Sequence, residues 1–306
     1  MPALSCRLEG LTGSIFFGVQ LRTWRWIFPS FSLAKVLPFA VPSFFKQSLA
    51  STLNLILPDD CRICGLPLRE FSRIPVCRSC LSQPKPLEAD HWCVTCGSPF
   101  LNAFPLDADG RCGLCRRGLA GFDAAYAFGS YEGTLRSLIH LLKYKKICSL
   151  SKPLGQLLAG ALPRHQRFDV VTAVPMHWRR RWMRGFNQAE LLAAEIGRHF
   201  HIPVKPLLKR CRPTPSQAGL TRAARRANVA GAFRVRNGVS AEGLRVLLVD
   251  DVMTTGATVS ACASALKRGG AKHVTVITLA RADRRLFLQT VNQPDRTPST
   301  RSLKDA

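Results

Sequence analysis

Eight of the twelve cysteines occur as four Cys-x-x-Cys pairs. Such a turn directs two sulfur atoms to one point, and two turns together supply the four thiolates that tetrahedral zinc prefers. Pairing in sequence order predicts two structural Zn2+ sites, with an interleaved pairing as the alternative. Redox or disulfide cysteines are a competing interpretation, but redox motifs come singly at the start of a helix. The predicted ligands are Cys61, Cys64, Cys77 and Cys80 in one site and Cys93, Cys96, Cys112 and Cys115 in the other.

A second pattern lies farther along the chain, where a hydrophobic run from Leu244 leads into two acids and a hydroxyl-rich turn. The acids, Asp250 and Asp251, fall where the run ends, and ligands bind at the carboxyl ends of strands in open α/β sheets. In the turn, backbone N–H groups, hydroxyls and the helix dipole can converge on a phosphate. Because carboxylates suit ribose hydroxyls and repel phosphate, the stretch predicts a clamp for ribose 5-phosphate. The turn comprises Met253, Thr254, Thr255, Gly256, Ala257 and Thr258.

A strongly basic segment follows another expected strand, since residues 177–236 hold fourteen Lys and Arg against two acids. We expect its start to form a strand-end loop that neutralises a pyrophosphate, and the arginines of 210–233 to close as a mobile lid. A solvated face for nucleic acid, without catalysis, is the alternative, and both can hold together. Trp178 and Trp182 either stack on bases or pack in the core. The residues assigned to the pyrophosphate loop are Pro175, Met176, His177 and Arg184.

Hydrophobic patterning predicts strands that alternate with helices after residue 121, which indicates a three-layer α/β fold with a parallel sheet. Strands are expected at 122–131, 169–175, 244–250 and 273–280, with a short one near Val204 and then a long basic loop. Helices are expected at 133–145, 153–162, 188–200 and 257–268.

The charge balance points to anionic partners. The chain has 44 Lys and Arg against 19 Asp and Glu, a formal net charge of +25. Such an excess attracts nucleic acid, an anionic membrane surface or a phosphorylated small molecule. No stretch approaches the roughly 18–20 apolar residues that cross a bilayer, so no membrane span is expected. The paired cysteine spacing favours thiolate ligands in a reducing compartment, which predicts a cytoplasmic protein.

The stretch 249–258, Val-Asp-Asp-Val-Met-Thr-Thr-Gly-Ala-Thr, resembles the phosphoribosyl diphosphate (PRPP) motif of type I phosphoribosyltransferases. The resemblance implies that Asp250 and Asp251 bind the ribose hydroxyls and that residues 253–258 hold the 5′-phosphate. It also implies Mg2+ held largely by the pyrophosphate of the ligand. An active enzyme would transfer the ribose 5-phosphate unit while Arg184 and the mobile loop stabilise the departing pyrophosphate.

Over about residues 49–281 the chain is similar to the ComF family. The motifs are the cysteine pairs, Ile-His-Leu-Leu-Lys-Tyr-Lys at 139–145, Arg-Gly-Phe-Asn-Gln at 184–188 and the PRPP-like stretch. The family combines a double zinc ribbon with a phosphoribosyltransferase-like domain and is linked to DNA uptake in natural transformation. The resemblance implies PRPP binding and cytoplasmic handling of single-stranded DNA beside DNA-processing proteins. The alternative is an active phosphoribosyltransferase in nucleobase or related salvage. Only about 26 residues follow the last expected strand, and they are expected to be disordered, so the N-terminal helix and the zinc ribbons would have to replace the hood that selects the base in many such enzymes.

These expectations divide the chain into four parts. The first, 1–48, is expected to be a disordered leader or upstream sequence from a misassigned start. The second, 49–118, is a double zinc ribbon with a short preceding helix. The third, 119–281, is a phosphoribosyltransferase-like domain of class α/β, with a parallel sheet flanked by helices. The last, 282–306, is a disordered tail.

Overall fold

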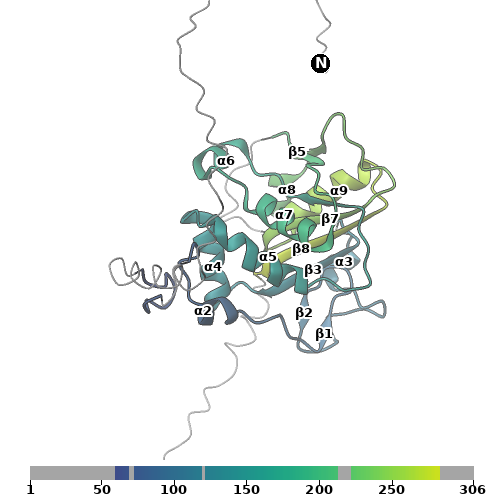
Figure 1. Ribbon diagram of the computed structural model, residues 1–306. Coiled ribbons are helices and arrows are strands. Elements are labelled where there is room, and N and C mark those ends of the chain that lie inside the picture. Colours follow the sequence, from purple (N-terminus) through teal and green to yellow (C-terminus); the bar gives the residue numbers. More distant parts are fainter. Residues whose placement is uncertain (1–58, 69–71, 119–120, 213–221, 283–306) are drawn as a thin grey trace, which may run out of the picture. The chain divides into compact units, whose positions relative to one another are not determined.

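The computed structural model describes residues 59–68, 72–118, 121–212 and 222–282 (Figure 1). All of these residues belong to one compact unit, Gln47–Ala306. The expected leader, the helix expected just after it and the expected tail beyond residue 282 lie outside the described residues, as does the part of the expected lid at 213–221.

The core of the protein is a four-stranded parallel sheet. Its strands run in the order β3 (Ala124–Ser130), β8 (His273–Arg281), β7 (Arg245–Met253) and β4 (Val170–Ala173). Val204, near which a short strand was expected, forms an isolated parallel bridge with Val171 of β4. The predicted fold class is therefore confirmed: strands and helices alternate, and all four strands point the same way.

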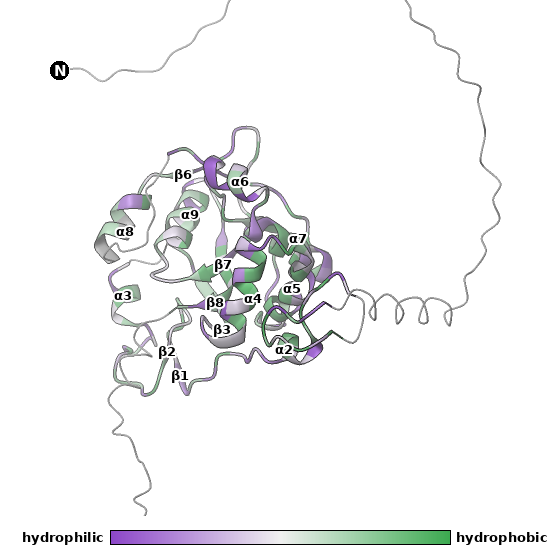
Figure 2. Ribbon diagram, turned by 90° about the vertical axis from the view of Figure 1, so that its left-hand side faces the viewer, coloured by the Kyte–Doolittle hydropathy of each residue, from purple (hydrophilic) through white to green (hydrophobic). Residues whose placement is uncertain are grey.

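Helices cover both faces of the sheet, and alternate residues of β7 distinguish the two faces. Leu247 and Val249 pack among the leucines of α4 (Gly133–Tyr144), α5 (Ser151–Gly160) and α7 (Gln188–Phe200). Val246 and Leu248 pack instead with residues of α9 (Ala257–Arg268). Accordingly, α5 and α7 contain many hydrophobic residues, whereas α6 (Trp178–Arg184) is mostly hydrophilic (Figure 2). A single 3-10 turn, Cys148–Leu150, precedes α5. Among the helices that the structure describes, none has the length and apolar character needed to cross a bilayer.

The basic segment contains more regular structure than its sequence predicts. A two-stranded antiparallel ribbon joins β5 (Leu208–Arg210) to β6 (Phe233–Val235), and α8 (Arg222–Val229) lies between them in the chain. The prediction of a long basic loop is therefore wrong here. The ribbon forms because Leu208 and Phe233 alternate with basic residues and bury their side chains in the core beside α9.

The cysteine region packs on both faces of the sheet. It contains α2 (Arg78–Ser82), β1 (His91–Trp92), β2 (Pro99–Phe100) and α3 (Gly113–Arg116). Cys61 and Cys80 lie in the core beneath α4, whereas Cys93 and Cys112 lie in the core on the α9 side. Between the two halves, the backbone N–H of Leu87 donates to the carbonyl of Phe128 in β3 at 2.7 Å. The segment that joins the two cysteine groups thus covers β3, an edge strand of the sheet, and proteins generally protect such edges from pairing with other chains.

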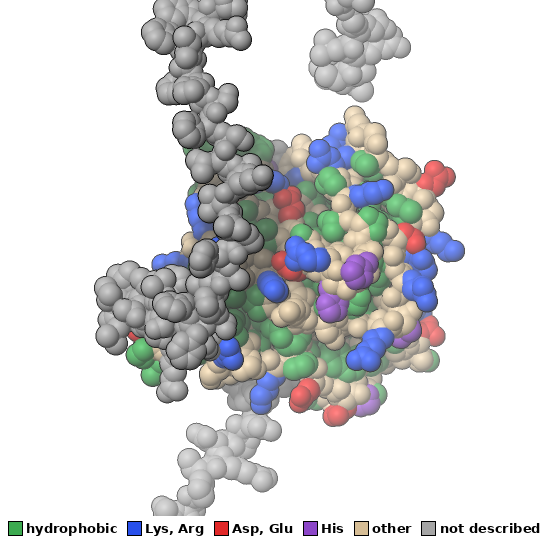
Figure 3. Space-filling model, viewed as in Figure 1, with side chains coloured by type: hydrophobic (Ala, Val, Ile, Leu, Met, Phe, Trp, Pro, Cys, Tyr) green, Lys and Arg blue, Asp and Glu red, His purple; other side chains and the backbone are tan. Residues whose placement is uncertain are grey.

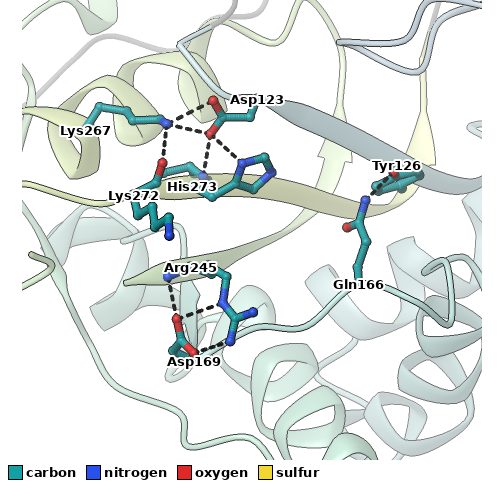
Figure 4. Close-up of polar contacts among 9 residues, drawn as sticks. Asp123, Tyr126, Gln166, Asp169, Arg245, Lys267, Lys272 and His273 are labelled. Carbon is teal, nitrogen blue, oxygen red and sulfur yellow. Dashed lines mark hydrogen bonds and ion pairs between the residues drawn. The ribbon is translucent and has the colours of Figure 1, made fainter. Parts of the chain in front are cut away.

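Ion pairs fix the amino ends of the strands, opposite the edge where ligands are expected (Figure 4). Arg245 at the start of β7 makes a bidentate contact with Asp169, with its Nη2 2.6 Å from Oδ1 and its Nε 3.1 Å from Oδ2. These hydrogen bonds lower the pKa of Asp169 to about 2. Lys267 of α9 lies 2.7 Å from Asp123 Oδ2, and His273 lies 3.5 Å from the same oxygen. The amino edge is therefore occupied by structural contacts.

Candidate ligand site at the carboxyl edge of the sheet

The two predicted acids lie at the carboxyl end of β7, which continues past them to Met253. Asp251 is mostly buried and bound from two sides. Lys143 Nζ of α4 lies 2.9 Å from its Oδ1, and Gln188 Nε2 of α7 donates to its Oδ2 at 3.0 Å. Asp250 Oδ1 accepts the backbone N–H of Asp251 at 2.9 Å. Helices from one face of the sheet therefore hold one acid of the pair in place beside the other.

The electrostatics of this pair suit a ligand with hydroxyl groups. Burial, reinforced by the charge of Asp251, raises the pKa of Asp250 to about 7. Burial alone would lower the pKa of Lys143, but the charges of Asp251 and Asp250 outweigh burial and raise it above its usual value. Near neutral pH the site thus contains an ammonium–carboxylate pair and a second carboxyl group that can readily gain or lose a proton. Carboxylates of this kind accept hydrogen bonds from neighbouring hydroxyls.

The turn after the acids leads directly into α9. Gly256 has φ +74° and forms the N-cap, a left-handed conformation that glycine adopts without strain. The Thr255 hydroxyl accepts the backbone N–H of Ala257 at 3.4 Å. The side chains of Met253 and Ala257 are buried in the core, so only their backbone groups can meet a ligand. The helix N-terminus and the exposed Thr254 therefore lie a few residues beyond the acid pair, at the same edge.

The predicted pyrophosphate loop follows β4 at this edge, but it forms a cap and a helix. Asn187 donates to the carbonyl of Val174 at 3.0 Å, which holds the chain just before Pro175 and Met176. His177 Nδ1 accepts the backbone N–H of Arg179 at 3.3 Å and so caps α6. Burial and then nearby arginines lower the pKa of His177. His177 therefore caps α6, and its role in neutralising a pyrophosphate stays a prediction.

Arg184 connects α6 to α4. Its guanidinium lies over the ring of Tyr144, 5.0 Å from the centroid, and Gly185 ends the helix with φ +85°. Tyr144 is the residue after Lys143, the lysine that contacts Asp251. Arg184 thus contacts the end of α4, the helix that also supplies Lys143, through an aromatic ring.

Sequence reasoning missed Lys143 and Gln188. Both occur in motifs that were recognised, Leu-Leu-Lys-Tyr-Lys and Phe-Asn-Gln, but neither was given a role. A signal was present in each case. In the sequence, Gln188 is a polar residue at the start of a helix whose inner face is apolar, and the structure shows that it is only 2% exposed. Lys143 interrupts the apolar end of α4, where a buried cation requires an anionic partner.

The tryptophans of α6 are exposed. The exposed fraction is 66% for Trp178 and 84% for Trp182, which excludes the alternative that they pack in the core. The guanidinium of Arg179 lies over the Trp178 ring at 5.4 Å. Lys and Arg side chains are also distributed across the face seen in Figure 3. Exposed aromatic rings among arginines form a surface on which bases can stack.

The eight cysteines form the two groups predicted from sequence order. In each group the four sulfur atoms lie within 4.8 Å of one another. The distance is 3.7 Å between the Sγ atoms of Cys64 and Cys77 and 3.7 Å between those of Cys96 and Cys112. These separations are too long for disulfides and fit four thiolates around one tetrahedral ion. Both groups can therefore hold a metal ion, and the interleaved pairing is excluded.

The chain is similar to known proteins over most of its length. The family described as "Phosphoribosyl transferase domain" matches residues 187–290. The "DNA utilization protein YhgH" of Escherichia coli (strain K12) is 31% identical over 236 residues, which are 74% of this chain and 99% of that protein. The "Competence protein F" of Haemophilus influenzae is 32% identical over 217 residues, 68% of this chain and 90% of that protein. The glutamine phosphoribosylpyrophosphate (PRPP) amidotransferase structure from B. subtilis aligns with a TM-score of 0.31 and 27% identity, over 42% of this chain and 26% of that one.

Proposed function

Because the chain belongs to the ComF family, we propose that it binds PRPP with Mg2+ at the carboxyl edge of the sheet and acts in DNA uptake and processing in the cytoplasm. One observation carries the proposal: a largely buried acid pair, Asp250 and Asp251, stands two residues before a glycine-capped turn into α9. Acids beside a phosphate-type turn suit a pentose with a terminal phosphate.

In this proposal the turn binds the 5′-phosphate through its backbone N–H groups and threonine hydroxyls. Asp250 and Asp251 accept hydrogen bonds from the ribose hydroxyls. Lys143 and Gln188 keep Asp251 oriented for this role, because both contact its carboxylate. Mg2+ would be held mainly by the pyrophosphate of the ligand and would offset its charge. Arg184 and the other arginines of α6 supply further positive charge at this edge.

We also propose that both cysteine groups bind Zn2+. Four thiolates close the coordination sphere, so the ions would have a structural role. Three of the four cysteines in the second group are fully or almost fully buried, which suits a site that stabilises the fold. Backbone N–H groups also point at the sulfurs, for example from Cys112 to Cys93 Sγ at 3.3 Å.

A titration tests the sugar-phosphate proposal. PRPP with Mg2+ is expected to raise the melting temperature of the full chain, and ribose 5-phosphate is expected to raise it less because it lacks the pyrophosphate. The measurement is thermal unfolding over a range of ligand concentrations, followed by an assay of pyrophosphate release. Release that depends on an added nucleobase would favour the alternative of an active phosphoribosyltransferase. The absence of any shift with PRPP would refute the proposed ligand.

The second part of the proposal is that α6 binds single-stranded DNA. Two observations favour it: the exposed rings of Trp178 and Trp182, and the exposed arginines that lie between them in sequence. Base stacking on such rings contributes about 1–3 kcal/mol per base. The strong net charge of +25 favours the same partner, since phosphates would replace released counterions.

Substitutions in α6 test this surface. Trp178→Ala/Trp182→Ala is expected to weaken binding of an oligonucleotide about tenfold or more at constant salt, because stacking is lost. Arg179→Ala/Arg180→Ala should instead reduce the salt dependence of binding, by about 0.7 in log–log slope per lost phosphate contact. The measurement is fluorescence anisotropy at several salt concentrations. Arg116→Ala/Arg117→Ala removes two exposed arginines from the region of α3 and serves as the control. Equal losses in the control and the α6 variants would contradict the assignment.

A further inference from the structure

Arg281 lies between the second cysteine group and the turn that is proposed to bind the ligand. It is the last residue of β8 and is only 6% exposed. In the sheet it is paired with Met253, the residue where β7 ends and the ligand turn begins. The backbone N–H of Ala282 donates to the carbonyl of Met253 at 3.0 Å, and that of Tyr131 donates to the carbonyl of Arg281 at 3.0 Å. The backbone of Arg281 is thus fixed to both neighbouring strands at the carboxyl edge.

The side chain of Arg281 reaches the second cysteine group. Its guanidinium donates to the carbonyl of Cys96 and to the hydroxyl of Ser98, the latter at 2.5 Å, and it lies 3.8 Å from Cys96 Sγ. Ser98 is fully buried, and its Oγ lies 3.0 Å from the same sulfur. A zinc ion with four thiolates has a net negative charge, which is the partner that a buried guanidinium requires. Residues of this kind outside the ligand set orient a metal's ligands and stabilise its charge.

The first cysteine group has different neighbours. Its segment contacts the helical face, where Cys61 and Cys80 pack beneath α4, and the Ser149 hydroxyl donates to the carbonyl of Arg73 at 2.7 Å. The hydrogen bonds of its sulfur atoms come from within the group, such as that from the backbone N–H of Cys77 to Cys61 Sγ at 3.4 Å. The two groups therefore provide an internal comparison: in the part of the chain that the structure describes, the Arg281 side chain links the second group to the end of β8, which pairs with β7 at the residue where the ligand turn begins.

We propose that Arg281 is a positioning residue that couples zinc at Cys93, Cys96, Cys112 and Cys115 to the ligand turn at 253–258. When the thiolates bind zinc, their charge holds the guanidinium, and the guanidinium holds the end of β8 against Met253. Loss of this zinc removes the negative charge beside a buried cation and loosens the start of the turn. The link to PRPP rests on the function proposed above. Because coupling between two sites is reciprocal, bound PRPP then retards the release of this zinc and not of the other.

Hydrogen exchange on the zinc-loaded full chain tests the mechanical part without any ligand. In Arg281→Met, amides of 253–258 are expected to exchange about tenfold faster or more than in the wild type. Arg281→Lys keeps the charge, and its amides of 253–258 should exchange at an intermediate rate. This variant also allows the test if Arg281→Met folds poorly. Arg245→Met removes an arginine from the opposite end of β7 and should leave this segment unchanged. Unchanged exchange in both Arg281 variants would overturn the proposal.

Zinc release to a zinc-selective chelator, measured with and without PRPP and Mg2+, tests the coupling. In the wild type, PRPP is expected to slow the release of one of two zinc ions about fivefold or more, within the usual range of coupling. Arg281→Met should abolish this difference. If PRPP raises the melting temperature but slows neither ion, the coupling is wrong and the proposed ligand stands. If PRPP does not bind at all, the proposed ligand is wrong, and the exchange experiment still decides the role of Arg281.

Discussion

Asp250→Asn is expected to unfold at a higher temperature than the wild type at pH 8 and to lose at least about tenfold in affinity for PRPP–Mg2+. The pKa of Asp250 is about 7 in the folded protein, against an ordinary value of 3.8. The folded state therefore binds this proton more tightly than the unfolded state, and stability is lost as the pH rises from about 4 to 7. Asparagine avoids that loss, and we expect a gain on the order of 1–3 kcal/mol at pH 8.

Asp169→Asn is the matched control, because it changes the same side chain at the opposite edge of the sheet. The pKa of Asp169 is lowered to about 2, so its ionised form stabilises the fold at neutral pH, and this contribution is lost only in acid. The control should therefore have a lower melting temperature at pH 8 and bind PRPP normally. Melting curves at pH 5 and pH 8, with and without PRPP, distinguish the two variants. A lower melting temperature for Asp250→Asn at pH 8 would contradict the electrostatic account.

Cys112→Ser is expected to reduce the zinc content from two ions per chain to one and to lower the melting temperature by roughly 10 °C or more. Cys112 lies in the core on the α9 side and caps α3. Without the ion, three thiols and a hydroxyl, most of them buried, would remain near Arg281 with no metal to satisfy them. Structural zinc contributes about 10–16 kcal/mol in isolated zinc-binding peptides, so even a fraction of that is large for a single domain.

Zinc content by atomic emission, together with calorimetry, measures this effect. Cys148→Ser is the control, because Cys148 is exposed and lies outside both cysteine groups. We expect the control to keep two zinc ions and the wild-type melting temperature. Cys64→Ser removes an exposed member of the first group and should cost less stability than Cys112→Ser, since less of the core depends on it. Two zinc ions in purified Cys112→Ser would show that this cysteine is not a ligand.

Local patterns in the sequence were sufficient to predict the sheet and the turn. The run that becomes β7 is apolar on both faces, which is typical of a strand buried between two helical layers, and α9 has the predicted bounds. The cysteine groups were predictable for the same reason, since the spacing of each pair fixes its geometry locally. Such features depend on neighbours in the sequence and not on the tertiary arrangement.

Other features depend on contacts between distant segments. Gln188 and Lys143 are 63 and 108 residues from Asp251, and only the packing of α7 and α4 on the sheet brings them to it. The ribbon of β5 and β6 was missed because each strand has only three residues, too few for a periodic signal. The helix α6 was missed because its arginines face solvent and its boundaries depend on a histidine cap and Gly185.

The pairing of β3 with β8 has a consequence for the order in which the chain folds during synthesis. The cysteine region is made early, yet the strand on which its linker lies is paired with the last strand of the sheet. Gly121, just before β3, likewise donates to Ser260 Oγ, 139 residues farther along. Loop closure over such separations is slow. If both cysteine groups bind Zn2+ as proposed, a nascent chain would capture zinc at its cysteines well before the surface that will support them has left the ribosome.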